Sequence, residues 1–456
     1  YRRSRMTDSR SVLIANRGEI AVRVNKACRE LGIKTIQVYS DADIDSLAVK
    51  MSDEAIRIGP AVSAKSYLNI DNMLAAAKSS GADAIHPGYG FLAENSEFAS
   101  AVESSGIKFL GPSSQAIKLL GDKVSARELV SSLNVATVPG SDGRVSDLSH
   151  AQVLAKDIGF PLMIKASAGG GGRGIRPVYN EDDLSRYFPQ ASAEALASFG
   201  DGGLYIEKYI ASARHIEVQI LGDGETYLHL FERDCSLQRR RQKVWEEAPA
   251  ICLSDETRQG MCDSALKICQ AVKYRGAGTV EFLYDTNSED YYFLEMNTRI
   301  QVEHPVTEMV TGIDIVKEMI CVGFGGKLSL KQNELKMTGH AIECRINAED
   351  PSVDFMPWPG TISKISFPEE SGVRFDSMLF EGYEVPPFYD SLLGKLIVYD
   401  QDRSRAIDKL KHVLDGFIIE GIPTTVRLHE KLVNDGDVIA GRVDIEFLEK
   451  WLLEQF

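Results

Sequence analysis

Residues 162–179 read LMIKASAGGGGRGIRPVY, a short apolar strand that runs into a glycine-rich tip. Three of these glycines fit the spacing G-x-G-x-x-G, but a dinucleotide site needs a helix directly after them. Pro177 and the apolar spacing around it favour a second strand instead. The sequence therefore predicts a hairpin flap, in which Lys165 and Arg173 flank bare N–H groups that can approach an anion. A surface hairpin without a ligand is the alternative for this stretch taken alone.

A second stretch, Tyr291–His304, carries a polar side chain at every odd position from 295 to 303. Successive side chains of an extended strand point to opposite faces. We therefore expect two carboxylates, two amides and a guanidinium on one face, with the even positions packed against a core. An ordinary half-exposed strand is the alternative, and alternation alone does not decide between the two. The five polar residues are Glu295, Asn297, Arg299, Gln301 and Glu303.

A neighbouring predicted strand, Gly278–Tyr284, carries another carboxylate, Glu281. We expect hairpin pairing through the turn at 285–290 to bring Glu281 near Glu295 or Asn297. Two carboxylates about 4 Å apart repel by roughly 4 kcal/mol at an effective dielectric constant of about 20, and a proton or a cation removes that cost. Oxygen ligands without His or Cys favour Mg²⁺ that is held partly by substrate phosphates. The flap and these carboxylates together predict a nucleotide and a magnesium ion.

The length of 456 residues suggests about three domains. Strand, helix and strand alternate after Ser11, which predicts a parallel α/β sheet in a first domain at 1–120. The first helix of this domain is expected to bury its apolar face and to expose Arg23, Lys26 and Glu30, a candidate dimer contact. We predict a middle domain at 121–335, with a lid at about 138–210, and a third domain at 336–456.

The composition is that of a globular protein, with 44% hydrophobic and 26% charged residues. The net charge of −15 argues against a general nucleic-acid binder. Seven cysteines without a Cys-x-x-Cys pair are expected to be reduced and mostly buried. No apolar run approaches the roughly 20 residues of a membrane span, and Val12–Ala15 is too short for a signal-peptide core. We expect a cytoplasmic protein that starts naturally at Met6 and does not associate with membranes.

Eight motifs, in order along the chain, resemble biotin carboxylase, the ATP-grasp subunit or domain of biotin-dependent carboxylases. The similarity extends from about residue 11 to residue 450. It implies an α/β and α+β architecture with a Rossmann-like N-terminal domain, an ATP-grasp domain with a glycine-rich lid, and a C-terminal biotin carboxylase domain. The motifs are IANRGEI (14–20), HPGYGFLAEN (86–95), GDK (121–123), the glycine flap, RDCS (233–236), YRGAGT (274–279), residues 295–305 and ECRINAED (343–350).

The same resemblance implies a role for each candidate site residue. ATP would contact Lys123, Lys165, Gly169, Gly170, Gly171, Gly172, Glu207, Lys208, Ile210, His215, Gln238, Arg241 and Leu283. Mg²⁺ or Mn²⁺ would be held by Glu281, Glu295 and Asn297. Bicarbonate would be bound by Lys243, Arg299, Gln301 and Val302, and biotin by Arg345 and Tyr89. The catalytic set would be Glu303 as the base, with Arg299, Arg345 and Lys243.

The implied reaction is the ATP-dependent carboxylation of carrier-bound biotin by bicarbonate through carboxyphosphate. The expected context is acetyl-CoA carboxylase in fatty acid synthesis, although the sequence leaves another acyl-CoA, pyruvate or urea open as the final acceptor. No Ala-Met-Lys-Met biotinylation motif occurs, so we expect biotin to arrive on a biotin carboxyl carrier protein. A carboxyltransferase and a second copy of the chain, in a homodimer, are the other expected partners.

Two positions depart from the family pattern. Arg241 stands where the family usually has a histidine, and the flap begins with Ser167-Ala168 rather than with a further glycine. Another ATP-grasp ligase, such as half of a carbamoyl-phosphate synthetase, is the nearest rival function. A nucleotide-binding regulator without activity is a rival of a different class. The presence of Lys243, Glu303 and Arg345 favours carboxylation over both.

Overall fold

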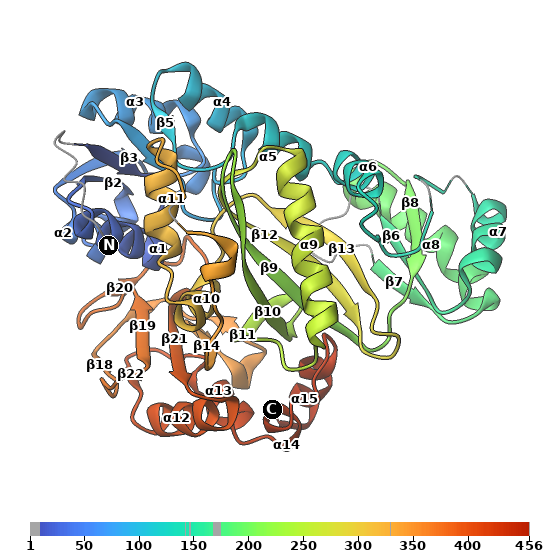
Figure 1. Ribbon diagram of the computed structural model, residues 1–456. Coiled ribbons are helices and arrows are strands. Elements are labelled where there is room, and N and C mark those ends of the chain that lie inside the picture. Colours follow the sequence, from blue (N-terminus) through green and yellow to red (C-terminus); the bar gives the residue numbers. More distant parts are fainter. Residues whose placement is uncertain (1–9, 142, 146, 167–174, 329, 456) are drawn as a thin grey trace.

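The computed structural model describes residues 10–141, 143–145, 147–166, 175–328 and 330–455. An N-terminal part, a large central sheet and a separate lobe can be followed in Figure 1. Among the described residues, no helix combines the length and apolar composition needed to cross a membrane.

The N-terminal part is a sheet with the strand order β3-β2-β1-β4-β5. Its strands are β1 (Ser11–Ile14), β2 (Lys34–Ser40), β3 (Glu54–Gly59), β4 (Ala84–His86) and β5 (Lys108–Phe109). All of its pairings are parallel, which confirms the predicted parallel α/β sheet. The order reverses between β1 and β4, and ligands of such sheets bind outside the carboxyl ends of the strands at that point. Asn16 and Tyr89 lie there, and Asn16 Nδ2 donates to the Tyr89 carbonyl at 2.7 Å.

Helix α1 (Gly18–Glu30) follows β1 and buries its apolar face, as predicted. The prediction that Arg23 is exposed is wrong, because this side chain is only 8% exposed. Its Nη2 donates to Glu308 Oε1 at 3.0 Å and to Asp314 Oδ1 at 2.7 Å. The partners come from α10 (His304–Thr311) and from the N-cap of α11 (Ile315–Gly323), which packs on α1. Lys26 is exposed as predicted.

The central sheet has the order β13-β12-β9-β10-β11-β14-β21-β19, and its pairings are antiparallel. Its strands are β9 (Ala213–Asp223), β10 (Tyr227–Arg239), β11 (Gln242–Ala248), β12 (Arg275–Asp285), β13 (Tyr291–Asn297), β14 (His340–Asn347), β19 (Val373–Ser377) and β21 (Leu392–Asp400). Strands from the middle and the C-terminal thirds of the chain are joined in it, because β11 pairs with β14.

Helix α9 (Asp255–Ala271) covers one face of this sheet. Met261 and Ile268 of the helix belong to the same buried cluster as Val218, Val280 and Phe282 of the strands. Because side chains alternate along a strand, Glu217 and Glu281 point to the opposite face. That polar face is where the candidate site lies.

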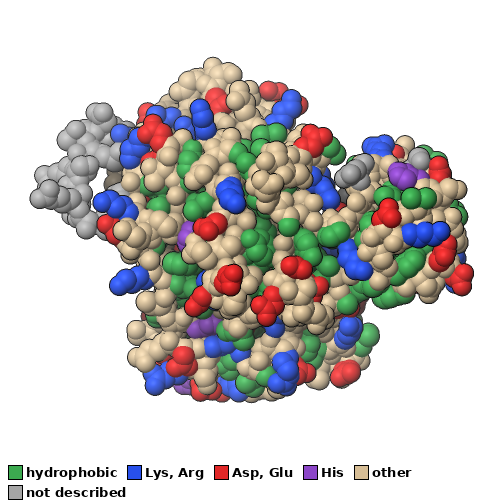
Figure 2. Space-filling model, turned by 45° about the vertical axis from the view of Figure 1, so that its right-hand side comes forward, with side chains coloured by type: hydrophobic (Ala, Val, Ile, Leu, Met, Phe, Trp, Pro, Cys, Tyr) green, Lys and Arg blue, Asp and Glu red, His purple; other side chains and the backbone are tan. Residues whose placement is uncertain are grey.

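The lid consists of β6 (Leu162–Ala166), β7 (Ile175–Val178), β8 (Leu204–Lys208), α7 (Leu148–Ile158) and α8 (Glu181–Phe199). Strand β6 pairs with both β7 and β8 in an antiparallel sheet with its own buried cluster. The two predicted strands of the flap are therefore present and paired, and the predicted tip lies outside the described residues. The lid forms a distinct lobe beside the main body (Figure 2).

The remaining helices are α2 (Leu47–Met51), α3 (Ile70–Ser80), α4 (Ser96–Ser104), α5 (Ser114–Gly121), α6 (Lys123–Ser132), α12 (Arg403–Asp415), α13 (Val426–Leu432), α14 (Gly436–Ile439) and α15 (Phe447–Gln455). The remaining strands are β15 (Glu349–Asp350), β16 (Met356–Pro357), β17 (Gly360–Thr361), β18 (Lys364–Ser366), β20 (Glu384–Val385) and β22 (Ile418–Glu420).

Candidate functional site

The predicted metal ligands lie side by side at one edge of the central sheet. Glu281 on β12 is the direct cross-strand partner of Glu295 on β13. Asn297 Nδ2 donates to Glu281 Oε1 at 2.9 Å. Loss of solvent around the carboxylate and the nearby charge of Glu281 raise the pKa of Glu295. This set of oxygen donors fits Mg²⁺ or Mn²⁺, because a cation would remove the repulsion between the two carboxylates.

Lys243 on β11 lies at the centre of the polar face. Its Nζ is 2.6 Å from Glu217 Oε2, 3.1 Å from Glu281 Oε1 and 2.6 Å from Glu303 Oε1. Burial opposes the charged form of Lys243, but the three carboxylates outweigh burial and raise its pKa well above the usual value. One cation thus neutralises part of a buried negative cluster.

Glu303 is held between two cations. Besides its contact with Lys243, it accepts a bond from Arg345 Nη2 at 2.9 Å. Arg345 on β14 is oriented in turn by Glu246, whose Oε1 accepts from Arg345 Nε at 2.6 Å. Burial favours the neutral acid, but Lys243 and Arg345 lower the pKa of Glu303 below its usual value. Glu303 is therefore ionised at neutral pH and can accept a proton.

The strand predicted through residue 303 is wrong beyond Asn297, where β13 ends. Residues 298–303 have no regular strand or helix, and Glu303 is the N-cap of α10. The strand ends because the Thr298 N–H binds the side chain of Glu94 at 2.9 Å instead of a neighbouring strand. Pro305, in the first turn of α10, then favours the start of that helix. We refer to residues 298–303 as the 298–303 loop.

The polar side chains of the 298–303 loop nevertheless converge on the site. Gln301 Nε2 donates to Glu281 Oε1 at 2.9 Å. Arg299 Nη2 donates to Asn297 Oδ1 at 2.8 Å, and its Nε donates to Glu94 Oε2 at 2.8 Å. The alternation therefore identified residues that the structure brings together, although the backbone that carries Arg299, Gln301 and Glu303 is a loop.

The residues expected to contact the adenine lie where the lid meets the sheet. Glu207 on β8 pairs with Lys165 and accepts from Arg127 Nη1 at 2.6 Å. Lys208 Nζ donates to the Gly159 carbonyl at 3.1 Å. Ile210, which is buried, also belongs to this group. So does Leu283 on β12, whose cross-strand partner is His215 on β9. Glycines 169–172 were predicted to bind ATP and lie outside the described residues.

The remaining predicted nucleotide contacts surround the carboxylates. His215 Nε2 is 3.1 Å from Glu281 Oε2. Gln238 Nε2 donates to the Cys235 carbonyl at 2.8 Å. Lys123 begins helix α6, and its positive charge lowers the pKa of Glu295, opposing the stronger effect of burial.

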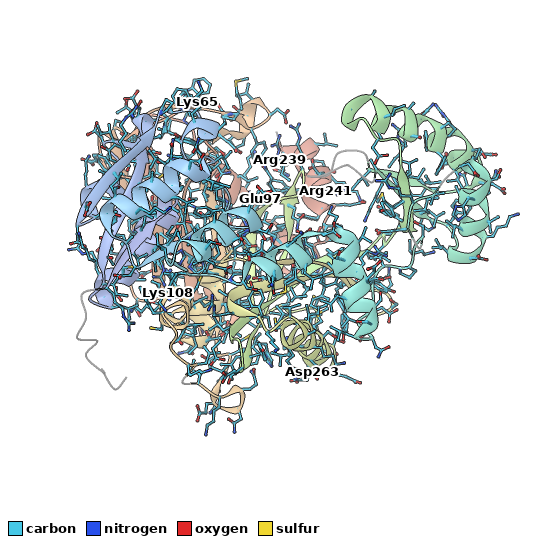
Figure 3. The ribbon with its side chains drawn as sticks, turned by 90° about the horizontal axis from the view of Figure 1, so that it is seen from above. Lys65, Glu97, Lys108, Arg239, Arg241 and Asp263 are labelled. Carbon is cyan, nitrogen blue, oxygen red and sulfur yellow. The ribbon has the colours of Figure 1, made fainter. Side chains whose placement is uncertain are left out.

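Arg241 occupies the turn between β10 and β11, with a φ of 64°. Its neighbours Arg239 and Arg240 both pair with Asp354, at 2.6 Å and 2.9 Å. Arg241 and Arg239 lie between the main body and the lid (Figure 3). Arg241 is exposed, and partial loss of solvent around the guanidinium lowers its pKa from the usual value.

Tyr89 lines a cavity of about 330 Å³ between the N-terminal part and the loop before β21. Its hydroxyl donates to Glu19 Oε1. The wall of the cavity also includes Phe91, Phe388 and Tyr389. Burial raises the pKa of Tyr89 well above the usual value. The positive charge of Arg345, the other predicted biotin contact, opposes that rise.

Sequence reasoning assigned no role to Glu217, Arg233 and Glu246, although Arg233 belongs to the RDCS motif. Arg233 is completely buried and donates to Glu217 Oε1 and Gln301 Oε1, both at 2.7 Å. A signal for Glu217 was available, because His215, Glu217 and Gln219 alternate along β9 as the residues of β13 do. Nothing comparable marks Glu246, whose neighbour Glu247 faces the other way and binds Arg403.

Comparison with protein families gives three matches in sequence order. Residues 8–117 match the biotin carboxylase N-terminal domain, and residues 343–450 match the biotin carboxylase C-terminal domain. Residues 122–331 match the ATP-binding domain of the carbamoyl-phosphate synthase L chain.

Individual proteins are similar over nearly the whole chain. Biotin carboxylase 1 of Bacillus subtilis (strain 168) is 53% identical over 444 residues, which are 97% of this chain and 98% of that protein. The crystal structure of a biotin carboxylase–β,γ-ATP complex from Campylobacter jejuni has a TM-score of 0.91 and 49% identity, covering 97% of this chain and 99% of that one. The biotin carboxylase domain dimer of Hydrogenobacter thermophilus 2-oxoglutarate carboxylase, in complex with MgADP, ADP and bicarbonate, has a TM-score of 0.90 and 46% identity, covering 97% of both chains.

Proposed function

The chain belongs to the biotin carboxylase family of ATP-dependent ligases, and we propose that it carboxylates biotin held on a carrier protein. Bicarbonate is the proposed source of carbon, ATP the source of energy, and carboxyphosphate the intermediate. The observation that supports this best is Glu303, an ionised carboxylate 2.6 Å from Lys243 Nζ and 2.9 Å from Arg345 Nη2. A proton acceptor between two cations suits a small anionic substrate that must lose a proton.

In the proposed first step, Lys243, Arg299, Gln301 and the backbone of Val302 hold bicarbonate while Glu303 removes its proton. The resulting oxygen nucleophile attacks the γ-phosphorus of ATP, which breaks the bond to ADP and forms carboxyphosphate. The phosphates of ATP would be bound by Lys123, Lys165 and the flap glycines 169–172. The nucleoside would contact Glu207, Lys208, Ile210, Leu283, His215, Gln238 and Arg241. Mg²⁺ or Mn²⁺ on Glu281, Glu295 and Asn297 would neutralise phosphate charge.

In the proposed second step, carboxyphosphate releases CO₂ and a phosphate ion that is basic enough to take the N1′ proton of biotin. Arg345 offsets the negative charge that develops on the ureido oxygen, as an oxyanion donor does. Tyr89 would contact the biotin ring system. The deprotonated nitrogen then attacks CO₂ and forms carboxybiotin.

We propose acetyl-CoA carboxylase of fatty acid synthesis as the setting of this half-reaction. The similarity to Bacillus subtilis biotin carboxylase 1, along 98% of that protein, supports the biotin carboxylase half-reaction in this proposal. The proposed partners are a biotin carboxyl carrier protein, a carboxyltransferase and a second copy of the chain, and the proposed compartment is the cytoplasm. The 2-oxoglutarate carboxylase relative is a domain dimer, which is consistent with a homodimer here.

The decisive experiment measures ADP release by the purified chain with Mg²⁺ and ATP. We expect release to require bicarbonate and to accelerate when free biotin is added. Biotin-independent formation of carbamoyl phosphate from ammonia would contradict the proposal and favour the rival ligase. Adding purified carrier, carboxyltransferase and candidate acyl-CoA or keto-acid acceptors in turn then identifies the acceptor.

A further inference from the structure

Lys395 is a completely buried lysine beneath the candidate site. It lies on β21, directly opposite Arg345 of β14 and Asp376 of β19. Its Nζ donates to the carbonyl oxygen of Val302 at 2.8 Å and lies 3.2 Å from Glu19 Oε1. Burying an ammonium group costs several kcal/mol unless it is well paired, so the fold depends on these contacts to compensate the buried charge of Lys395.

The contact with Val302 acts directly on the proposed base. A peptide unit is planar, so the Val302 carbonyl and the Cα of Glu303 belong to one rigid group. The 298–303 loop lacks the strand pairing that fixes its neighbours. At its other end the Thr298 N–H donates to Glu94 Oε1 at 2.9 Å. Lys395 therefore fixes the end of the loop from which Glu303 projects.

Glu19 connects Lys395 to the proposed biotin contact. It lies in the first turn of α1 and is only 2% exposed. One oxygen, Oε1, receives the hydroxyl of Tyr89 and faces Lys395, whereas Oε2 has no partner among the described residues. Because the other oxygen is unsatisfied, the orientation of Glu19 depends on Tyr89 and Lys395.

We propose that Lys395 is a positioning residue for bicarbonate, and that Glu19 couples it to Tyr89 so that the biotin and bicarbonate subsites are mechanically linked. This inference rests on the proposed function, because it assigns bicarbonate to the 298–303 loop. Lys395 itself is not a catalytic residue, since Val302 and Glu303 lie between it and the reacting atoms. Displacement of a reacting group by about 1 Å can cost about a hundredfold in rate, so a buried support of this kind affects catalysis.

The first test compares Lys395→Met with Lys409→Met. Lys409 on α12 is a suitable control because its Nζ also binds backbone carbonyls, those of Ser371 and Tyr399 at 3.0 and 2.9 Å, but none in the 298–303 loop. In biotin-free, bicarbonate-dependent ATP hydrolysis, we expect Lys395→Met to raise the KM for bicarbonate about tenfold to a hundredfold. The KM for ATP is expected to stay unchanged, as are both constants in Lys409→Met. Lys395→Arg, which keeps the charge and the donors, is expected to restore part of the loss.

A measurement independent of activity follows hydrogen exchange of the peptide that contains residues 298–303. Faster exchange in Lys395→Met than in the wild type and in Lys409→Met would show that Lys395 holds the 298–303 loop in place. Equal exchange together with a normal KM for bicarbonate would overturn the inference. If the wild type itself showed no bicarbonate-dependent hydrolysis, the proposed function would fail instead, so the two failures are distinguishable.

Tyr89→Phe tests the coupling of Tyr89 to Lys395 through Glu19, and it leaves the charge of Lys395 in place. If Lys395→Met does not fold, this variant alone tests the inference. A residue that only contacts biotin cannot affect bicarbonate when biotin is absent. We expect Tyr89→Phe to raise the KM for bicarbonate about threefold to tenfold in the biotin-free assay, which is less than the full effect of losing one hydrogen bond to a charged group, because the loss acts on bicarbonate only through Glu19 and Lys395. An unchanged KM in this variant would disprove the link through Glu19.

Discussion

The lid and the central sheet each hold a lysine beside a carboxylate, but in different surroundings. In the lid, Lys165 pairs with Glu207, and 33% of the lysine side chain is exposed. In the sheet, the side chain of Lys243 is 12% exposed and that of Glu303 only 3%. Exposed pairs are screened by water and rearrange easily, whereas buried pairs are fixed by their surroundings. The comparison indicates a preorganised site around Glu303, where we propose that bicarbonate binds, and a more adaptable lid, where we propose that the nucleotide binds.

The strongest challenge to this contrast is Glu303→Gln. We expect kcat to fall about a thousandfold, because general-base catalysis contributes about 10²–10⁴-fold, while ATP still binds. Steady-state kinetics and titration with a fluorescent nucleotide measure the two effects. Glu384→Gln, at an exposed position of β20, is the control and should change neither. Carboxylation at the wild-type rate in Glu303→Gln would remove this residue from the role of base.

Lys243→Met tests the buried side through stability. Removing the cation takes a buried positive partner from Glu217, Glu281 and Glu303 at once, so the free energy of unfolding should fall by about 3–5 kcal/mol. The matched control is Lys34→Met, which breaks an exposed pair with Glu54 and should lower the free energy of unfolding far less, because water screens such a pair. Urea denaturation measures both variants. Equal losses would show that the two environments do not differ as described.

Lys165→Met tests the lid side. The free energy of unfolding should change by less than about 1 kcal/mol, because the pair with Glu207 is partly exposed. The KM for ATP should rise about tenfold through loss of a charged phosphate contact. A normal KM for ATP would exclude Lys165 from nucleotide binding.

Glu246 provides a pH test of the buried side. Burial raises its pKa from 4.5 to about 7, so the folded protein keeps a proton that the unfolded chain releases between these values. Its contribution to the free energy of unfolding therefore decreases as the pH rises from 4.5 to about 7. Denaturation curves across this range should show that decrease in the wild type and in Glu384→Gln, and a smaller one in Glu246→Gln. Parallel profiles for all three proteins would contradict the raised pKa.

The smallest effect is expected for Arg241→His at the β10–β11 turn. No ion pair of Arg241 is lost among the described residues, so stability should not change. The KM for ATP should rise about twofold, because an exposed charge contributes little. An unchanged KM would show that position 241 does not contact nucleotide.

Local patterns predicted the elements that carry the site. The parallel N-terminal sheet, the strands of the flap and the pairing of Glu281 with Glu295 all follow from strand periodicity and short turns. The prediction failed where the chain leaves the strand after Asn297, because alternation of polar and apolar residues does not distinguish a strand from a loop whose side chains are bonded individually.

Contacts between residues far apart in the sequence were the other feature that could not be predicted. Arg23 appeared to belong to a solvent-facing position of an amphipathic helix, yet its partner Glu308 lies 285 residues away. Lys395 and Val302 are 93 residues apart, and nothing near either residue indicates their contact. Such pairs depend on how the sheet and α1 are packed together, which no local pattern contains.

The pairing of β11 with β14 also determines how the molecule would respond to a nick between α11 and β14. Each fragment would be left with an unprotected edge strand, and Trp245 would lose its neighbour Cys344. Such edges readily recruit another strand. Separately expressed halves should therefore aggregate alone and regain activity when refolded together, a complementation that would make the enzyme suitable as a split reporter.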